Sequence, residues 1–203
     1  MIIAIAGKSG SGKSTLVNNF IEKHKDYHKV IPYTTRPKRP SEQDGVDYHF
    51  VSKEDFLKKD TLFLESIYNN DWRYAIDERD IVDISEMDFG DDIIIFADYR
   101  KPKKAIGVFT PANVRRLKEK LGSKVISVYI NSNDSSNIIR VLQRGDDIKE
   151  VIRRYPTELG QFDGYEYESD ICIGSSLTEY TPETLLEELE TELYKIKDYR
   201  DSE

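Results

Sequence analysis

Cysteine is almost absent from this chain, because Cys172 is the single one among 203 residues. A lone cysteine cannot form an internal disulfide, which excludes the disulfide-stapled folds of small secreted proteins. It also excludes a zinc site built from several cysteines. We therefore expect a protein of the reducing cytoplasm.

Long apolar runs are missing as well. The runs 1–6 and 93–97 are the longest of the strand type, and both fall far short of the roughly 20 apolar residues that span a bilayer. The first run leads directly into Gly7 and has no basic leader, so it predicts a strand and not a secretion signal. We expect no membrane segment.

Positive charge is in short supply. The chain has 30 Lys and Arg residues against 38 Asp and Glu residues, which gives a net charge of -8. Such a balance disfavours a broad face for nucleic acid or anionic lipid, so any phosphate contact must be local. We expect neither nucleic acid nor a membrane as a partner, and the sequence leaves the oligomeric state open.

Short strand patterns and helical patterns do alternate along the chain. The strand patterns are residues 1–6, 93–97, 125–130 and 171–173, and the helical ones are residues 16–24, 111–121, 134–144 and the segment after Pro182. This alternation predicts an α/β fold with a parallel sheet flanked by helices.

Two segments interrupt the alternation. Residues 33–80 combine a Pro-rich basic loop, a turn at Asp44-Gly45 and short aromatic strand candidates, which we interpret as an inserted subdomain. Residues 144–161 are polar and Arg-rich, Pro156 interrupts them, and their composition is typical of a mobile flap. We therefore expect one domain with a core of about 1–32, 81–143 and 162–203, an insert of about 33–80 and a lid of about 144–161.

Residues 7–14, Gly-Lys-Ser-Gly-Ser-Gly-Lys-Ser, match the phosphate-loop pattern G-x-x-x-x-G-K-S/T between a predicted strand and a predicted helix. Glycines let backbone N–H groups turn toward a phosphate, Lys13 reaches the terminal phosphates, and the Ser14 hydroxyl can bind Mg²⁺. The alternative is an ordinary Gly-Ser turn. The predicted ATP-binding residues are Gly7, Gly10, Ser11, Gly12, Lys13, Ser14 and Thr15.

The chain also resembles the guanylate kinases, a family of phosphate-loop nucleoside monophosphate kinases. Residues 34–40 (TTRPKRP) and 44–51 (DGVDYHFV) are similar to the T-T-R-x-P-R and D-G-x-D-Y-x-F segments of that family, and weaker likeness covers nearly the whole chain. The resemblance implies a phosphate-loop NTPase-type core, an NMP-binding insert and a lid. It also implies phosphoryl transfer from Mg-ATP to GMP or dGMP.

The basic loop of the insert is the predicted cradle for the acceptor's phosphate. Arg36 and Arg39 can bind a phosphate dianion through planar forks, and the hydroxyls of Tyr48 and Tyr74 can donate further hydrogen bonds. The resemblance implies this role. From charge alone, the loop could equally be a solvated surface segment.

Two carboxylates could recognise the base. Guanine offers adjacent N1–H and amino donors that a carboxylate accepts, and the resemblance implies that Glu65 and Asp98 supply it. Asp98 ends the apolar run 93–97, which would place it at the carboxyl edge of a parallel strand, where α/β sheets bind ligands. Asp98 could instead order water around Mg²⁺, and either residue could be an ordinary surface acid.

Several arginines lie in or beside the predicted lid. Arginines that a closing lid delivers stabilise the charge of phosphoryl transfer and exclude water. Comparison with the family favours Arg144 and Arg154, which with Lys13 are the predicted catalytic residues. The alternative is solvated arginines on a helix surface.

The chain departs from the family where the base would bind. Pro32 and Ile76 stand at positions that usually carry hydroxyl residues, Ala75 replaces a glycine, and residues 96–100 replace a stretch with two acids. The phosphate contacts are retained, whereas the base contacts are fewer. Alternatives are therefore a kinase for another nucleoside monophosphate or a non-catalytic guanylate-kinase-like binding module, although such a module does not need Lys13 and Ser14.

Overall fold

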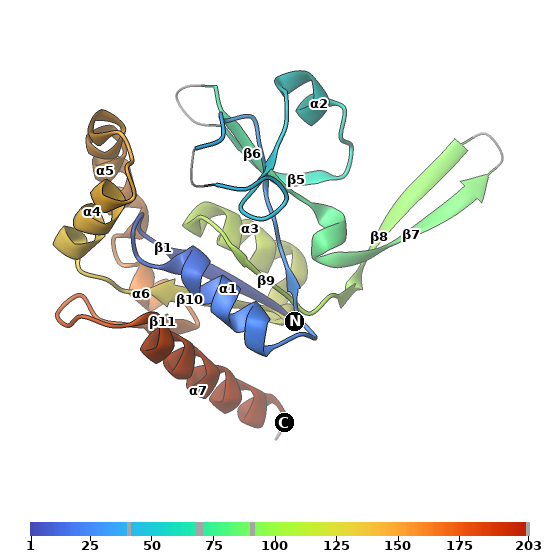
Figure 1. Ribbon diagram of the computed structural model, residues 1–203. Coiled ribbons are helices and arrows are strands. Elements are labelled where there is room, and N and C mark those ends of the chain that lie inside the picture. The colour runs from blue at the N-terminus through green and yellow to red at the C-terminus, as the bar shows by residue number, and fades with distance from the viewer. Residues whose placement is uncertain (40–41, 68–70, 90–91, 202–203) are drawn as a thin grey trace. The chain divides into compact units, whose positions relative to one another are not determined.

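The computed structural model describes residues 1–39, 42–67, 71–89 and 92–201, with side chains described except at 83–102 and 197–201 (Figure 1). The chain forms two compact units. The first unit contains Met1–Ile2, Lys25–Gly107 and Arg115–Val125, and the second contains Ile3–His24, Val108–Val114 and Ile126–Glu203.

The strands are β1 (Ile2–Gly7), β2 (His28–Lys29), β3 (Tyr33–Thr34), β4 (His49–Phe50), β5 (Leu62–Ile67), β6 (Arg73–Asp77), β7 (Val82–Phe89), β8 (Asp92–Pro102), β9 (Ala105–Val108), β10 (Val125–Ile130) and β11 (Ile171–Ile173). The α-helices are α1 (Lys13–Lys23), α2 (Lys53–Leu57), α3 (Pro111–Leu121), α4 (Asp134–Gln143), α5 (Ile148–Phe162), α6 (Tyr165–Glu168) and α7 (Pro182–Asp201). Short 3₁₀ helices are η1 (Glu78–Asp80) and η2 (Gly122–Lys124).

A five-stranded sheet has the order β11-β10-β1-β9-β2, and the pairs β10–β11 and β2–β9 are parallel. All residues of β1 and β10 are buried, as their continuous apolar sequences predict. The out-of-sequence strand order requires crossover connections, which here include helices. The predicted α/β class, with a parallel central sheet flanked by helices, is confirmed.

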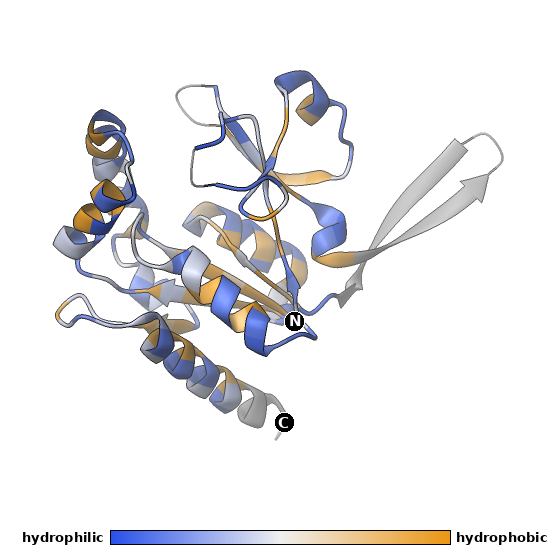
Figure 2. Cartoon of the chain, viewed as in Figure 1, coloured by the Kyte–Doolittle hydropathy of each residue, from blue (hydrophilic) through white to orange (hydrophobic). Residues whose placement is uncertain are grey.

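Apolar helix faces complete the core of the second unit. Helix α1 contacts α7, in which Leu185 and Leu189 are buried. From α5 and α6, Phe162 and Tyr165 pack on Tyr129 of β10, with ring centroids 5.6 Å from it. Figure 2 shows the result as orange central strands beside helices that carry both orange and blue.

The first unit contains a separate four-stranded sheet, in the order β4-β3-β6-β5. Strand β3 pairs with β4 in parallel and with β6 in antiparallel orientation. The β5–β6 pairing shifts register between Phe63 and Ser66, and Leu64 there has a positive φ of 58°. This bulge carries Glu65, one of the predicted site residues.

Strand 93–97 does not belong to the parallel sheet, so that prediction is wrong. These residues lie in β8, which pairs antiparallel with β7 in a two-stranded sheet. The central sheet instead uses β9, in which Ala105 and Ile106 are fully buried. Because β9 has four residues and contains Gly107, its sequence signal is weaker than that of the longer apolar run.

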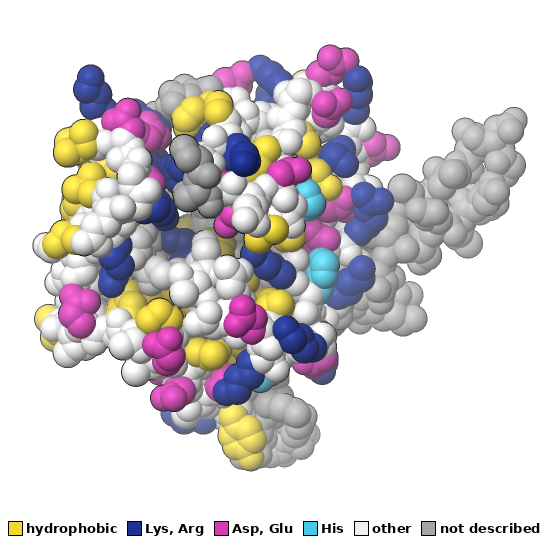
Figure 3. Space-filling model, viewed as in Figure 1, with side chains coloured by type: hydrophobic (Ala, Val, Ile, Leu, Met, Phe, Trp, Pro, Cys, Tyr) yellow, Lys and Arg dark blue, Asp and Glu magenta, His cyan; other side chains and the backbone are white. Residues whose placement is uncertain are grey.

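Helix α5 runs through Pro156, so the prediction that this proline interrupts the segment is wrong. The helix begins after Asp147, whose side chain accepts a hydrogen bond from the Lys149 N–H. Ile148 and Ile152 of α5 are 56% and 66% exposed, and Figure 3 shows hydrophobic side chains gathered over α4 and α5. This face of α5 is therefore outside the core.

Two further findings concern the single cysteine and the length of the apolar helices. The Cys172 side chain, in strand β11, is exposed. Within the described ranges, no helix is both long and apolar enough to cross a membrane.

Candidate functional site

The predicted phosphate loop is a strand–loop–helix turn in the second unit. Strand β1 ends at Gly7 and α1 begins at Lys13, and the intervening Gly10 and Gly12 have φ angles of 82° and 91°. A Cβ on Gly10 would lie 2.4 Å from the carbonyl oxygen of Asn137, so a larger residue would displace backbone there. Glycine at position 10 is therefore a steric requirement of this fold.

Lys13 is held across the loop. Its Nζ donates a hydrogen bond of 2.7 Å to the carbonyl oxygen of Lys8. Burial lowers the pKa of Lys13 to about 8; the nearby Glu158 carboxylate opposes this shift, and Arg144 and Arg154 add to it. A buried lysine with two arginines near it is an environment that favours an incoming polyanion.

The remaining loop residues differ in exposure. Ser14 and Thr15, at the start of α1, are exposed, which leaves the Ser14 hydroxyl accessible. Ser11 is fully buried, and its Oγ has no hydrogen-bond partner among the described residues. The side chain of Ser11 therefore lies inside the turn, so that only its backbone could contact a phosphate.

A carboxylate from α5 contacts the loop. Glu158 accepts hydrogen bonds from the Ser9 N–H at 2.9 Å and from the Ser9 hydroxyl at 2.5 Å. Backbone N–H groups of this loop are the donors that phosphate oxygens use. Glu158 thus places an anion against the loop, and its charge acts on Lys13.

The predicted lid arginines share one acidic partner. Arg144 donates two hydrogen bonds to Asp146, at 2.9 and 2.7 Å, and Arg154 lies 3.6 Å from the same carboxylate. The Asp146 side chain is only 3% exposed. Arg140, in contrast, donates from Nε to the carbonyl oxygen of Gly10 at 2.8 Å, directly on the phosphate loop.

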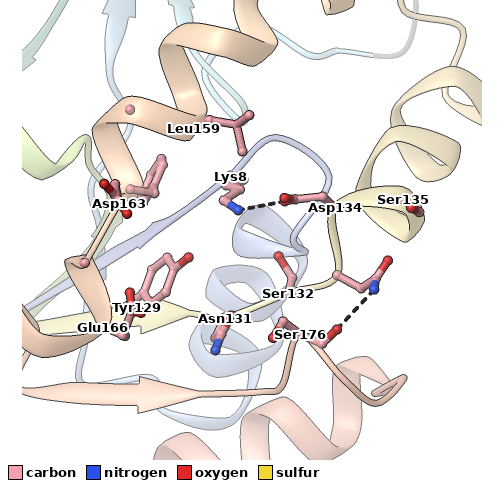
Figure 4. A pocket seen from close by; sticks show the side chains of 14 residues that line it. Lys8, Tyr129, Asn131, Ser132, Asp134, Ser135, Leu159, Asp163, Glu166 and Ser176 are labelled. Carbon is pink, nitrogen blue, oxygen red and sulfur yellow. Dashed lines mark hydrogen bonds and ion pairs between the residues drawn. The ribbon is translucent and has the colours of Figure 1, made fainter.

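A cavity of about 640 Å³ lies beside the phosphate loop in the second unit (Figure 4). Lys8 lines it and points toward Asp134, with which it forms an ion pair of 2.7 Å. Neither Lys13 nor Ser14 lines this cavity. The hollow therefore adjoins the phosphate loop and is not the phosphate cradle itself.

The predicted acceptor cradle is assembled in the first unit around a residue that the sequence did not single out. Arg36 donates to both carboxylate oxygens of Glu42, at 3.1 and 2.7 Å. The backbone N–H of Arg39 donates to the same carboxylate at 2.8 Å, and the Arg39 guanidinium lies 3.9 Å from it. Arg36 and Arg39 therefore converge on one anionic group.

The two predicted tyrosines adjoin these arginines. The Arg36 guanidinium lies 5.3 Å from the ring centroid of Tyr48, whose ring is 6.0 Å from that of Tyr74. Burial, followed by the neighbouring Tyr74, raises the pKa of Tyr48, so this hydroxyl stays protonated and can donate. The structure thus brings Arg36, Arg39, Tyr48 and Tyr74 together.

Of the two predicted base-reading carboxylates, the structure describes the side chain of Glu65 only. The Glu65 carboxylate is 40% exposed and accepts a 2.5 Å hydrogen bond from Arg73. Asp98 lies in β8 and not at the carboxyl edge of a parallel strand, so the argument that placed it there fails. The side chain of Asp98 is outside the described part of the chain.

Sequence reasoning missed four charged residues of the site. Glu42, Arg73 and Asp146 contact predicted residues, and Glu158 contacts Ser9 of the phosphate loop. Glu42 and Asp146 lie within a few residues of the arginines they hold, so local charge pairing could have suggested them. Glu158 lies 149 residues from Ser9, and no local pattern indicates that contact.

Comparison with known proteins shows the family of this chain. A family model described as guanylate kinase matches residues 1–192. The chain is 30% identical over 174 residues to a guanylate kinase of Zymomonas mobilis, covering 82% of this chain and 74% of that protein. It is 29% identical over 174 residues to one of Sphingopyxis alaskensis, with coverages of 82% and 73%.

A solved structure is also similar. The crystal structure of guanylate kinase from Anaplasma phagocytophilum matches with a TM-score of 0.56 over 85% of this chain and 75% of that one. At 18% sequence identity this likeness supports the fold alone. Because the family model spans nearly the whole sequence and includes both predicted phosphate sites, the chain belongs to the guanylate kinase family.

Proposed function

We propose that this chain, a phosphotransferase of the guanylate kinase family, transfers the γ-phosphoryl group of ATP to GMP and yields ADP and GDP. The observation that carries this proposal is the convergence of Arg36 and Arg39 on one carboxylate, beside Tyr48 and Tyr74. Glu42 occupies the position of an anion in this cluster, and a phosphate dianion offers the same fork-shaped acceptor geometry.

The donor side follows from the phosphate loop. Loop N–H groups would hold the β- and γ-phosphates of ATP, and Lys13 would neutralise the charge that develops during transfer. An oxygen of the acceptor phosphate is the nucleophile. It is already ionised at neutral pH, so the chain needs no general base and has only to position the two substrates and stabilise charge.

Magnesium is the metal that the residues fit. The accessible Ser14 hydroxyl lies at the start of α1, and no group of three His, Cys, Asp or Glu side chains suited to a metal occurs in the described part of the chain. Mg²⁺ is commonly held by few protein ligands together with substrate phosphates and water. Ser14 would hold the ion, which when bound neutralises phosphate charge.

Residues 144–161 would act as a lid and residues 33–80 as the NMP-binding insert around the remaining core. Support for the insert is its own four-stranded sheet. Support for the lid is the exposed apolar face of α5, together with Arg144 and Arg154, whose charges act on Lys13. A reaction between two soluble nucleotides would take place in the cytoplasm.

Transfer to another nucleoside monophosphate is the second candidate. The observation that favours it is Ile76, which is buried at 4% exposure and has no hydrogen-bonding group to offer a base. This candidate keeps the phosphate cradle and changes only the base contacts.

The test is ADP formation from Mg-ATP with GMP, dGMP, AMP, CMP, UMP or dTMP as the acceptor. We expect turnover to depend on the acceptor and to be fastest with GMP or dGMP. Lys13→Ala should abolish turnover without lowering the melting temperature, because Lys13 contributes charge and no core packing. A folded Lys13→Ala variant with normal turnover would contradict the proposal. Wild-type protein that makes no ADP with any acceptor would also contradict it and would indicate a non-catalytic binding module.

A further inference from the structure

A second charged residue lies against the predicted base reader. Arg73 Nη1 donates to Glu65 Oε1 at 2.5 Å, and the Arg73 side chain is 19% exposed. The Arg73 Nε is buried and has no hydrogen-bond partner among the described residues. This guanidinium therefore has donors that Glu65 does not use.

The backbone on both sides of this pair is held in place. Arg73 exchanges two hydrogen bonds with Thr35, from its N–H to the Thr35 hydroxyl at 3.0 Å and from the Thr35 N–H to its carbonyl at 3.1 Å. Arg116 donates to the Glu65 carbonyl oxygen at 3.3 Å. Thr35 precedes Arg36, so Arg73 is anchored to the loop that carries the phosphate cradle.

The bulge at Leu64 aims the Glu65 side chain. Leu64 is buried at 1% exposure and adopts a positive φ, which for a branched residue costs energy that the surrounding packing must offset. Bulges of this kind frequently redirect a side chain beside a functional site. Here the redirected side chain is the carboxylate that meets Arg73.

The pair presents a pattern of hydrogen-bond donors and acceptors that matches guanine. The Watson–Crick edge of guanine shows two donors, the 2-amino group and N1–H, followed by the acceptor O6. Glu65 supplies two adjacent acceptors, and the Arg73 guanidinium supplies a donor next to Oε1. Adenine has an amino group where guanine has O6, so a guanidinium there would oppose adenine.

We propose that Arg73 is a specificity-determining residue that donates to O6 of guanine while Glu65 accepts from N1–H and the 2-amino group. This inference rests on the proposed function. Base recognition would then depend on an ion pair in place of a neutral hydroxyl.

The experiment compares Arg73→Met with wild type using GMP, IMP, AMP and 2-aminopurine riboside monophosphate as acceptors. IMP keeps O6 and N1–H, whereas the 2-aminopurine nucleotide lacks O6. We expect kcat/KM to fall roughly 5- to 150-fold for both GMP and IMP, mainly through KM, and to stay unchanged for the other two. Lys58→Met, which removes an exposed cation paired with Glu54 in the same unit, is the matched control.

Arg73→Lys separates a loss of base recognition from a loss of folding. It keeps the charge beside Glu65 and removes the planar fork of the guanidinium. We expect it to retain the wild-type melting temperature and part of the preference for GMP over AMP. Equal losses for all four acceptors, or no change for GMP, would overturn the assignment of Arg73. If wild type does not phosphorylate GMP at all, the proposed function fails instead, so the two failures are distinguishable.

Discussion

The Glu158 carboxylate binds the phosphate loop at Ser9, through the backbone N–H at 2.9 Å and the hydroxyl at 2.5 Å. Its charge also acts on Lys13, whose Nζ bonds the carbonyl oxygen of the preceding Lys8. The terminal phosphate of ATP needs the same cation and the same side of the loop. We therefore expect Glu158 and the donor phosphate to compete.

Glu158→Gln should strengthen donor binding. The amide keeps the size of the side chain and removes the charge, so the contact with Ser9 weakens and phosphate repulsion disappears. We expect the KM for ATP to fall about 2- to 12-fold, which corresponds to about 0.5 to 1.5 kcal/mol. Steady-state kinetics at saturating GMP measure the KM for ATP of the variant and of wild type.

The control for Glu158 is Glu192→Gln, which removes an exposed carboxylate paired with Lys195 in α7. This variant should leave the KM for ATP at the wild-type value. An unchanged or raised KM in Glu158→Gln would show that the carboxylate does not compete with the donor.

The pH dependence of donor capture should report Lys13. Burial lowers the pKa of Lys13 to about 8, so the side chain is a cation below that pH and becomes neutral above it. Because kcat/KM for ATP reports groups of the free enzyme, it should be level below about pH 8 and fall roughly tenfold per pH unit above it.

The pH dependence of kcat/KM for ATP should also report the effect of Glu158 on the pKa of Lys13. The Glu158 carboxylate raises the pKa of Lys13, so Glu158→Gln should move the descending limb to lower pH. A limb that stays in place, or one that begins near the ordinary lysine pKa of about 10.4, would exclude this coupling.

Arg39→Ala should weaken every monophosphate alike. Arg39 is 30% exposed and faces the anion position held by Glu42, so it contacts a group that all acceptors share. We expect acceptor KM values to rise roughly 10- to 150-fold, by the same factor for each base. Kinetics across the acceptor panel test this, and a base-dependent loss would remove Arg39 from the phosphate cradle.

Ile76→Thr should destabilise the protein. Ile76 is 4% exposed and pairs with Phe63 across β5 and β6, so threonine would bury a hydroxyl and lose packing. We expect a loss of about 1 to 3 kcal/mol, or roughly 2 to 12 °C in melting temperature. Ile67→Thr, at a site 56% exposed in β5, is the control and should shift the melting temperature little. Equal shifts in the two variants would contradict the burial of Ile76.

Contiguous segments made the phosphate sites predictable. The donor loop from Gly7 to Ser14 is one strand–loop–helix turn in which Gly10 and Gly12 adopt positive φ angles, a local backbone requirement that the motif records. The acceptor loop likewise carries Arg36 and Arg39 within one short stretch. Short contiguous motifs, together with the family resemblance for the acceptor loop, were therefore enough to predict residues of both sites.

Strand membership was not predictable in the same way. Residues 93–97 are more apolar than β9, yet β9 occupies the central sheet and β8 pairs with β7. An apolar run indicates a strand but not its partner, because pairing depends on the crossover connections and on the neighbouring side chains. The misplacement of Asp98 follows from this limit.

The sequence by itself determined the fold class, because short-range patterns of strands and helices encode it, whereas the phosphate loop and the arginines of the two phosphate sites stay predictions from motifs and from the family resemblance. Only the tertiary structure decided that Glu158 reaches Ser9 across 149 residues and that Arg73 meets Glu65 at a bulge. Such contacts depend on how helices and strands distant in sequence, or a bulged pair of strands, pack against each other. The charge of a side chain can be read from its residue type, whereas the residue that it pairs with depends on tertiary packing.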